Sequence, residues 1–276
     1  MLSSVRFLVM ARAVSAVAAA CLSLAATQAE AATILPHRAI YALTLAKEQA
    51  EFGGLIDARG KLEFEWADVC DGWSVRQRAQ IIVTHKDDSE IAFGWSINSW
   101  ESKDGLSYRF FIRRLLADGE DLEVRGSAQI DGEGGAGEVH YTTPEERQEA
   151  LPRGTIFPTQ HSIEVIEAVE SGTVPLWRVV FDGSGDEGLY GINVALARDL
   201  PPGLDASIDS PLLRGLPSWR VGVAYFGMES EAAEPEFEQD MRLFSNGVVD
   251  ELLLDYGDFT LDGALADLVE LPAPDC

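Results

Sequence analysis

Four side chains have an ordinary pKa that suits a base near neutral pH, namely His37, His85, His140 and His161. His161 is the most suggestive, because Thr159 and Ser162 beside it carry hydroxyls that a base could activate. The alternative is structural, since a polar side chain at the start of a helix helps to satisfy free backbone N–H groups. No G-x-S-x-G elbow, H-E-x-x-H pair or phosphate-binding loop occurs in the sequence. We therefore expect a structural His161 and a protein that is not an enzyme.

Carboxylates at alternate positions raise the question of a calcium site. The segment 182–186 reads Asp-Gly-Ser-Gly-Asp, but Glu187 stands where an EF-hand loop needs glycine, and Asn193 stands where its bidentate glutamate would fall. We interpret this segment as a solvated hairpin tip. The acidic run from Glu229 to Glu238 is interpreted as an exposed loop that leads into a strand. The sequence thus predicts no metal site and no cofactor.

The charge balance excludes two classes of partner. The chain has 46 acidic against 21 basic residues, a net charge of −25, and a pI near 4.3. Binding to nucleic acid and to anionic membrane surfaces both depend on lysine and arginine. We therefore expect no nucleic-acid partner and no docking on an anionic membrane. The 46% of hydrophobic residues suffices for a sizeable core.

The first 31 residues are typical of a cleavable secretory signal peptide. Two arginines precede an apolar run from Ala13 to Ala26, and Ala29-Glu30-Ala31 is an A-x-A cleavage signature. A membrane anchor is one alternative, but the run is shorter than the roughly 20 residues that a span needs. A lipoprotein is another, because Cys21 follows a hydrophobic stretch, yet the leucine usual three residues before it is absent. We expect export from the cytoplasm.

Removal of the signal peptide leaves two cysteines, Cys70 and Cys276. An even pair in an exported protein implies a disulfide. Two unrelated thiols, or a metal pair, are the weaker alternatives, because the sequence has no C-x-x-C and no histidine at ligand spacing. A bridge that closes so long a loop contributes about 5 kcal/mol in the chain-entropy model.

Alternation with a period of two dominates the rest of the chain. Leu62–Trp66 places three large apolar side chains on one face and two carboxylates on the other, as a half-buried strand requires. Further strands are predicted at Val75–Val83, Phe93–Ile97, Leu106–Ile112, Leu122–Gly126, Trp177–Phe181, Tyr190–Leu196, Trp219–Phe226, Phe237–Phe244, Val248–Tyr256 and Phe259–Leu261. Asn246-Gly247 predicts a type I′ hairpin turn.

One segment predicts a helix. From Thr159 to Gly172, Ile163, Ile166 and Val169 recur at three-residue spacing, with Thr159 as a cap and Gly172 as the end. A second, short turn of helix is predicted around 143–150. Because no long helix separates successive strands, we do not expect parallel βαβ units. The predicted fold is mainly β, a single domain over residues 32–276. It is one large curved antiparallel sheet of about 12 to 14 strands, a β-spiral or half-open barrel, with one amphipathic helix on its concave side.

Four segments of the chain, 35–39, 64–73, 100–110 and 151–161, resemble the EipB family of alphaproteobacterial cell-envelope integrity proteins. The resemblance implies a periplasmic protein with a spiral-like sheet and a disulfide between Cys70 and Cys276. It also implies a likeness in shape to the lipoprotein carriers LolA and LolB, whose half-open barrels hold acyl chains. A TPR-repeat protein is a partner that the resemblance suggests.

Large aromatic side chains fall mostly on the apolar phases of the predicted strands. The plain interpretation is the core of a β-protein, but one helix does not fill so wide a sheet, and wide barrels commonly keep a ligand cavity. We expect an apolar cleft between sheet and helix, lined by Phe64, Trp66, Trp95, Tyr108, Phe110, Phe157, Ile163, Ile166, Trp177 and Phe181. In this arrangement Phe157 is a plug at one end, and the helix is a lid or inner wall.

The sequence therefore predicts a non-enzymatic periplasmic protein that supports envelope integrity. Its expected partner is a lipid-like ligand, the acyl chain of a lipoprotein, or another periplasmic protein. An interaction scaffold with a filled concave face is the alternative. A third interpretation is a hydrolase of envelope polymers, which would need two carboxylates facing each other roughly 5 to 10 Å apart.

Overall fold

The computed structural model describes residues 34–46, 54–115, 121–184, 188–200, 206–228, 232–257 and 259–276. The predicted signal peptide lies outside these residues. Residues Ala31–Cys276 form one compact unit. No helix in the described part of the chain is long and apolar enough to cross a membrane.

The described chain forms strands and one helix, α1 (Pro158–Ser171). The strands are β1 (His37–Leu45), β2 (Leu55–Asp68), β3 (Gly72–His85), β4 (Glu90–Ser102), β5 (Ser107–Leu115), β6 (Asp121–Ile130), β7 (Gly137–Thr143), β8 (Arg147–Leu151), β9 (Thr155–Ile156), β10 (Leu176–Phe181), β11 (Leu189–Asp199), β12 (Ser218–Gly227), β13 (Phe237–Phe244), β14 (Val249–Asp255) and β15 (Thr260–Glu270).

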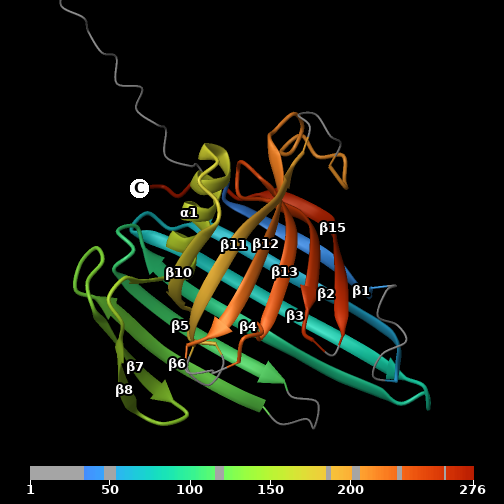
Figure 1. The fold of residues 1–276 in the computed structure, drawn as a ribbon, viewed down its shortest axis with the longest axis horizontal. Coiled ribbons are helices and arrows are strands. Elements are labelled where there is room, and N and C mark those ends of the chain that lie inside the picture. Colours follow the sequence, from blue (N-terminus) through green and yellow to red (C-terminus); the bar gives the residue numbers. More distant parts are fainter. Residues whose placement is uncertain are drawn as a thin grey trace, which may run out of the picture. The chain divides into compact units, whose positions relative to one another are not determined.

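All fifteen strands belong to one sheet, in the order β8-β7-β6-β5-β4-β3-β2-β1-β15-β14-β13-β12-β11-β10-β9. Neighbours are antiparallel except β9 and β10, which are parallel. Figure 1 shows β10 to β13 and β15 in front of β2 to β6, so the sheet curls until it is nearly closed into a barrel. The predicted fold class, a curved sheet with one helix, is confirmed, with 15 strands where about 12 to 14 were expected.

The alternation that predicted the strands separates the two faces of the sheet. In β1, Ala39, Tyr41 and Leu43 are buried, whereas their neighbour Arg38 is half-exposed. Helix α1 packs against the concave face, where its Val165, Ile166 and Val169 share a core cluster with residues of β10 to β13. The concave face is therefore apolar and carries the helix, as predicted.

Helix α1 starts differently from the prediction. Its N-cap position is Phe157, which makes no side-chain cap hydrogen bond, and Pro158 is the first helical residue. Thr159 does not cap the helix. Instead its backbone N–H donates to the carboxylate of Glu101 in β4. The predicted end is correct, because Gly172 follows α1 in the left-handed conformation, with φ of 70°.

Two further local predictions are wrong. The segment predicted as a short helix around 143–150 is the end of β7, a turn, and β8, whose ladder pairs Tyr141 with Arg147. The turn after β13 is not of type I′, because Gly247 has a positive φ of 83° and Asn246 does not. A left-handed glycine after an ordinary turn makes the same reversal with one special residue instead of two.

The chain is closed by a disulfide between Cys70 and Cys276, with the two Cα atoms 5.9 Å apart. Cys70 lies in the turn between β2 and β3 and has a positive φ of 69°. The bridge ties the C-terminal residue to this turn across a sequence separation of 206. It joins the pair of cysteines that the sequence predicted.

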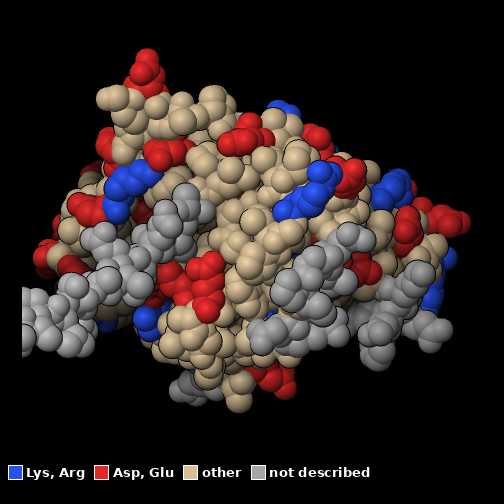
Figure 2. Space-filling view, turned by 90° about the horizontal axis from the view of Figure 1, so that it is seen from above, with Lys and Arg blue, Asp and Glu red and all other residues tan. Residues whose placement is uncertain are grey.

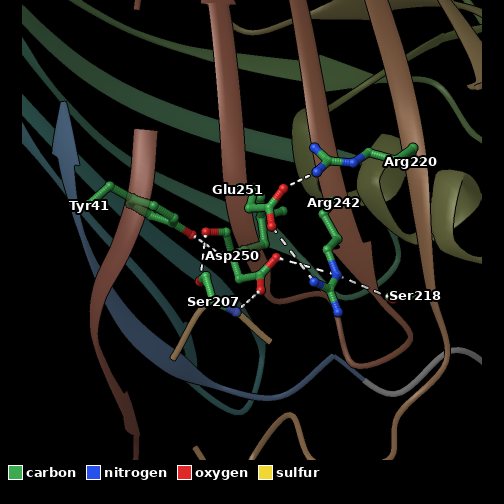
Figure 3. A network of polar contacts seen from close by, with 8 residues as sticks. Tyr41, Ser207, Ser218, Arg220, Arg242, Asp250 and Glu251 are labelled. Atoms are coloured by element: carbon green, nitrogen blue, oxygen red, sulfur yellow. Dashed lines mark hydrogen bonds and ion pairs between the residues drawn. The ribbon is translucent and has the colours of Figure 1, made fainter. Parts of the chain in front are cut away.

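A buried ionic network fastens a long connection to the sheet (Figure 3). The guanidinium of Arg242 in β13 lies 3.7 Å from a carboxylate oxygen of Asp250 and 3.7 Å from one of Glu251, which also contacts Arg220. Asp250 in turn accepts a hydrogen bond of 2.7 Å from the backbone N–H of Ser207. The segment that begins at residue 206 is thereby held against β13 and β14.

The surface carries the excess of acidic residues without a single dominant patch on the face seen from above. Figure 2 shows acidic and basic side chains scattered among uncharged ones on that face. In the acidic run that the sequence analysis singled out, Glu234, Glu236 and Glu238 are exposed and lead into β13. The interpretation of this run as a solvated approach to a strand is correct for its described residues.

Candidate functional site

Four of the ten predicted cleft residues form a filled aromatic cluster. Tyr108, Phe110, Phe157 and Phe181 are each at most 3% exposed, and Tyr141 completes the cluster. Tyr108 stacks on Phe157 with ring centroids 5.1 Å apart, and Phe110 meets Phe181 edge-on at 5.6 Å. Because the rings occupy one another's space, this part of the predicted cleft is core.

The cluster exists because the two ends of the sheet overlap. Val180 faces the concave side of β10 with α1, whereas the next residue, Phe181, faces the opposite side and contacts β5 and β7. The hydroxyl of Tyr108 donates to the carbonyl of Asp182 across the overlap, at 3.2 Å. A Cβ atom on Gly183 would lie 2.7 Å from the ring of Phe110. The β9–β10 end of the sheet thus packs against the inner face of strands β5 to β7.

The residues predicted beside the helix fill the concave face there. Trp66 is 5% exposed and Ile166 is 1% exposed, and both share one core cluster with partly buried Ile163 and Phe64. Trp66 meets Trp73 edge-on at 6.1 Å. The indole N–H of Trp66 has no hydrogen-bond partner among the described residues. This end of the concave face is packed.

Trp177 does not belong to the predicted cleft. It lies on the outer face of β10, opposite to Val180, and is 49% exposed. Its ring lies against that of Phe226, with centroids 5.9 Å apart. The apolar phase of this short strand could not be assigned from its sequence, because both of its faces carry apolar side chains.

The last predicted residue, Trp95, belongs to a different arrangement at the other end of the concave face. Along β13, Leu243 packs in the cluster of α1, while Phe237 at the opposite end packs beside Tyr256. Aromatic contacts run on from there: Tyr190 to Tyr225 at 6.1 Å, Tyr225 to Phe237 at 5.4 Å, Phe237 to Tyr256 at 5.1 Å and Tyr256 to Trp95 at 6.5 Å. We call these five residues the aromatic rim.

All five residues of the aromatic rim are partly exposed, although they pack against the core clusters. Phe93 and Phe259, which contact each other at 6.1 Å, extend the rim toward β4 and β15 and are also partly exposed. An inward-facing side chain is exposed only where solvent reaches the concave face. The concave face is therefore less completely buried at this end than at the end that holds α1.

Polar side chains close the aromatic rim between Trp95 and Tyr190. Arg114 in β5 stands directly opposite Trp95 in the ladder. Asp182, just after β10, accepts hydrogen bonds from the backbone N–H of Ser184 at 2.7 Å and from its hydroxyl at 2.9 Å. Burial raises the pKa of Asp182, and the charge of Arg114 lowers it in part. This end of the concave face thus combines aromatic rings with one cation and one hydrogen-bonded carboxyl.

Sequence reasoning missed Tyr190, Tyr225, Phe237 and Tyr256. All four lie at or next to the end of a predicted strand, on its apolar phase, and the sequence analysis does not single them out. A signal was present in their chemistry, because tyrosine at the end of a strand presents an apolar ring and a polar tip, as at a partly wet opening. The contacts between strands far apart in sequence were not available from the pattern.

A groove with a volume of about 1180 Å³ lies on the outer face of the sheet, and its lining includes Phe64 and Trp95. Its floor is the backbone of β3 and β4 with the small side chains Ala92, Gly94 and Ser96, and none of its lining residues belongs to β10–β15. Its basic side chains are Arg38, Arg59, Lys61, Arg76, Arg78 and Arg113. Ion pairs join Arg59 to Glu90, Lys61 to Glu63, Arg76 to Glu65 and Arg113 to Asp121.

Groups that could do acid–base chemistry are placed separately. His161 is 7% exposed, its Nε2 has no partner in the described part of the chain, and burial lowers its pKa to about 4. Its neighbour Ser162 donates to the carbonyl of Pro158. Among the described residues, no group of three or more histidine, cysteine or acidic side chains could hold a metal ion.

Comparison with known proteins covers almost the whole chain. Residues 28–272 match the family model described as EipB-like. The cell envelope integrity protein EipB of Brucella abortus (strain 2308) is 30% identical over 253 residues, which are 88% of this chain and 87% of the relative. The crystal structure of a beta-barrel-like protein of the domain of unknown function DUF1849, also from Brucella abortus, is similar with a TM-score of 0.77. It is 27% identical, and the match covers 88% of this chain and 100% of the other.

Proposed function

The chain belongs to the EipB-like family, and from that premise we propose that it supports cell-envelope integrity in the periplasm by holding the apolar part of a lipid-like molecule. The binding place is the open end of the concave face, inside the aromatic rim. The ligand is a free lipid or the acyl chain of a lipoprotein. The role is non-enzymatic and needs no cofactor.

The aromatic rim is the observation that carries this proposal. Ligand sites for apolar molecules are concave and lined by aromatic side chains with a few polar groups that fix orientation. At the rim, inward-facing rings from β4, β11, β12, β13 and the turn after β14 contact one another and stay partly exposed. A fully packed core would leave these rings buried, as it does in the cluster around Phe181.

Contact quenching tests the position of the ligand. Bromine atoms on an acyl chain quench a tryptophan only at close range, so a dibrominated fatty acid should quench Trp95 and leave Trp177 unaffected. The Trp95→Phe variant should lose the saturable part of the quenching, whereas Trp177→Phe, altered on the outer face of the sheet, should retain it. Equal quenching in both variants, or none in the folded wild-type protein, would contradict the proposal.

A protein scaffold is the second candidate, and the outer groove favours it. A partner strand or loop could lie over the small side chains of β4, with the surrounding arginines as polar contacts. The partner would be another periplasmic protein, such as the TPR-repeat protein suggested by family resemblance. Substitution of the exposed Ala92 by glutamine should then abolish co-purification of the partner, while binding of fatty acid at the aromatic rim stays unchanged.

The hydrolase interpretation has less support. The buried carboxylates Glu101 and Asp182 each accept hydrogen bonds from nearby backbone N–H groups. Asp250 likewise accepts one from Ser207 and pairs with Arg242. These contacts assign each carboxylate a structural task in a different part of the sheet, which favours a binding protein.

A further inference from the structure

We propose that Arg114 binds the anionic head group of an amphiphile whose apolar part lies inside the aromatic rim. This inference rests on the proposed function and adds two things to it, the chemical class of the ligand and the side chain that selects it. A carboxylate and a phosphate monoanion or diester are the head groups that a guanidinium recognises in common.

The position of Arg114 on the concave face follows from the ladder. Ile112, two residues earlier in β5, is 1% exposed in the core, and Arg113 between them faces outward into the outer groove. Arg114 is paired directly with Trp95 across β4 and β5. Residues directly opposite in an antiparallel ladder point to the same face. Arg114 therefore stands beside Trp95 at the aromatic rim, where it is partly buried.

Arg114 differs from its neighbour Arg113 in its contacts. Within the described chain, no hydrogen bond or ion pair of Arg114 is formed, whereas Arg113 contacts both Asp121 and Glu123. The carboxyl of Asp182 is near enough to respond to the charge of Arg114, but both of its oxygens already accept hydrogen bonds from Ser184.

A cation that has no ion-pair partner among the described residues and stands beside aromatic rings selects one kind of amphiphile. Guanidinium and carboxylate or phosphate form strong, directional hydrogen bonds, and partial exclusion of water strengthens them. The aromatic rings beside it would take the adjoining methylene groups. A neutral head group gains no ion pair there, and a cationic head group is repelled.

The test compares four amphiphiles of similar chain length with purified full-length mature protein. Dodecanoate and lauroyl lysophosphatidylglycerol are the two anionic probes, monolaurin is the neutral probe, and dodecyltrimethylammonium is the cationic probe. Affinities are measured by displacement of a naphthyl fluorophore. The variants are Arg114→Met, Arg114→Lys as the conservative change, and Arg113→Met as the matched control on the opposite face.

In the wild-type protein, both anionic probes should bind at least about tenfold more tightly than monolaurin and the cationic probe. Arg114→Met should lose this preference while monolaurin binds as before, Arg114→Lys should keep part of it, and Arg113→Met should keep all of it. A difference between the two anionic probes would identify the preferred source of the charge.

Two results would overturn the inference, and they can be told from failure of the proposed function. If Arg114→Met binds dodecanoate like the wild type, or if Arg113→Met loses as much affinity, Arg114 is not the head-group site although the chamber still binds amphiphiles. If the wild-type protein binds none of the four probes, the aromatic rim is not a ligand site, and both proposals fail together. Retention of the melting temperature in Arg114→Lys shows that its readings refer to folded protein.

Discussion

The carboxylate of Glu101 caps helix α1 from a distant strand: one oxygen accepts the backbone N–H of Thr159 at 2.7 Å, and the other accepts that of Gln160 at 2.8 Å. The first N–H groups of a helix have no partner inside the helix, and the N-cap residue Phe157 supplies none. Glu101 is 2% exposed and lies 58 residues earlier in the sequence. The contact therefore fixes the start of α1 to β4.

We expect Glu101→Ala to lower the free energy of unfolding by about 1 to 3 kcal/mol, because it leaves two buried N–H groups without acceptors. Chemical denaturation followed by circular dichroism measures the change. Glu167→Ala, in the exposed face of the same helix, is the control and should change stability by less than about 0.5 kcal/mol. Equal losses of unfolding free energy in the two variants would show that Glu101 does not stabilise the start of α1.

Glu101 should also make stability depend on pH. Burial raises the pKa of Glu101 to about 7, although the hydrogen bonds from the two backbone N–H groups act in the opposite direction and lower it. Between the ordinary pKa of a glutamate and about 7, the folded protein keeps a proton that the unfolded chain releases, so the contribution of this group to stability falls as pH rises through this window. Denaturant midpoints between pH 5 and pH 8 should therefore fall more steeply for the wild type than for Glu101→Gln. Parallel profiles would contradict the assignment.

The disulfide gives a prediction about global stability. Cys70 and Cys276 are 206 residues apart in sequence, so their bridge restricts the unfolded chain strongly, by up to about 5 kcal/mol in the chain-entropy model. Cys70→Ser and Cys276→Ser should lower the melting temperature by the same amount, and reductant should lower that of the wild type alone. Non-reducing peptide mapping should recover the linked pair. Free alkylation of both thiols in native oxidised protein would refute the bridge.

Hydrogen exchange distinguishes a permanent core helix from a lid. The aromatic rim lies at the end of the concave face away from α1, so a ligand can enter without displacement of the helix. Glu101 holds one end of α1, and Arg178 is paired with its Glu164 at 2.6 Å. We expect the amides of α1 to exchange as slowly as those of β12 and β13, with or without fatty acid. Faster exchange in α1 that slows on binding would restore the lid that the sequence suggested.

Much of the fold follows from the alternation of side chains, and the exceptions have physical causes. Leu62–Trp66 and Phe237–Phe244 are strands because one face of each is covered and the other is wet. The predicted turn of helix around 143–150 is replaced by a turn and β8, because pairing with β7 along the sheet overrides the weak helix propensity of residues such as Glu149 and Ala150.

The candidate site was less accessible to sequence reasoning than the fold. Trp95 is partly exposed and Phe181 is buried because of which strands overlap. The overlap is set by the curl of the whole sheet, which a local sequence pattern does not record. Local pattern records only that a side chain is apolar. Arg114 shows the same limit, because two adjacent arginines in a strand must face opposite sides, and neither spacing nor composition says which side is wet.

The overlap of the sheet ends predicts two very different effects within one short strand. Phe181 is fully buried between β10 and the strands β5 and β7, whereas Trp177, four residues earlier on the same face, is 49% exposed because the overlap does not reach it. Phe181→Ala should therefore cost about 3 to 5 kcal/mol of unfolding free energy by leaving a cavity among the aromatic rings. Trp177→Ala should cost less than about 1 kcal/mol, since its side chain is about half exposed to water. Chemical denaturation of the two variants measures both changes in unfolding free energy. If Trp177→Ala lost as much stability as Phe181→Ala, the outer face of β10 would be covered evenly, and the overlap of the sheet ends would be contradicted.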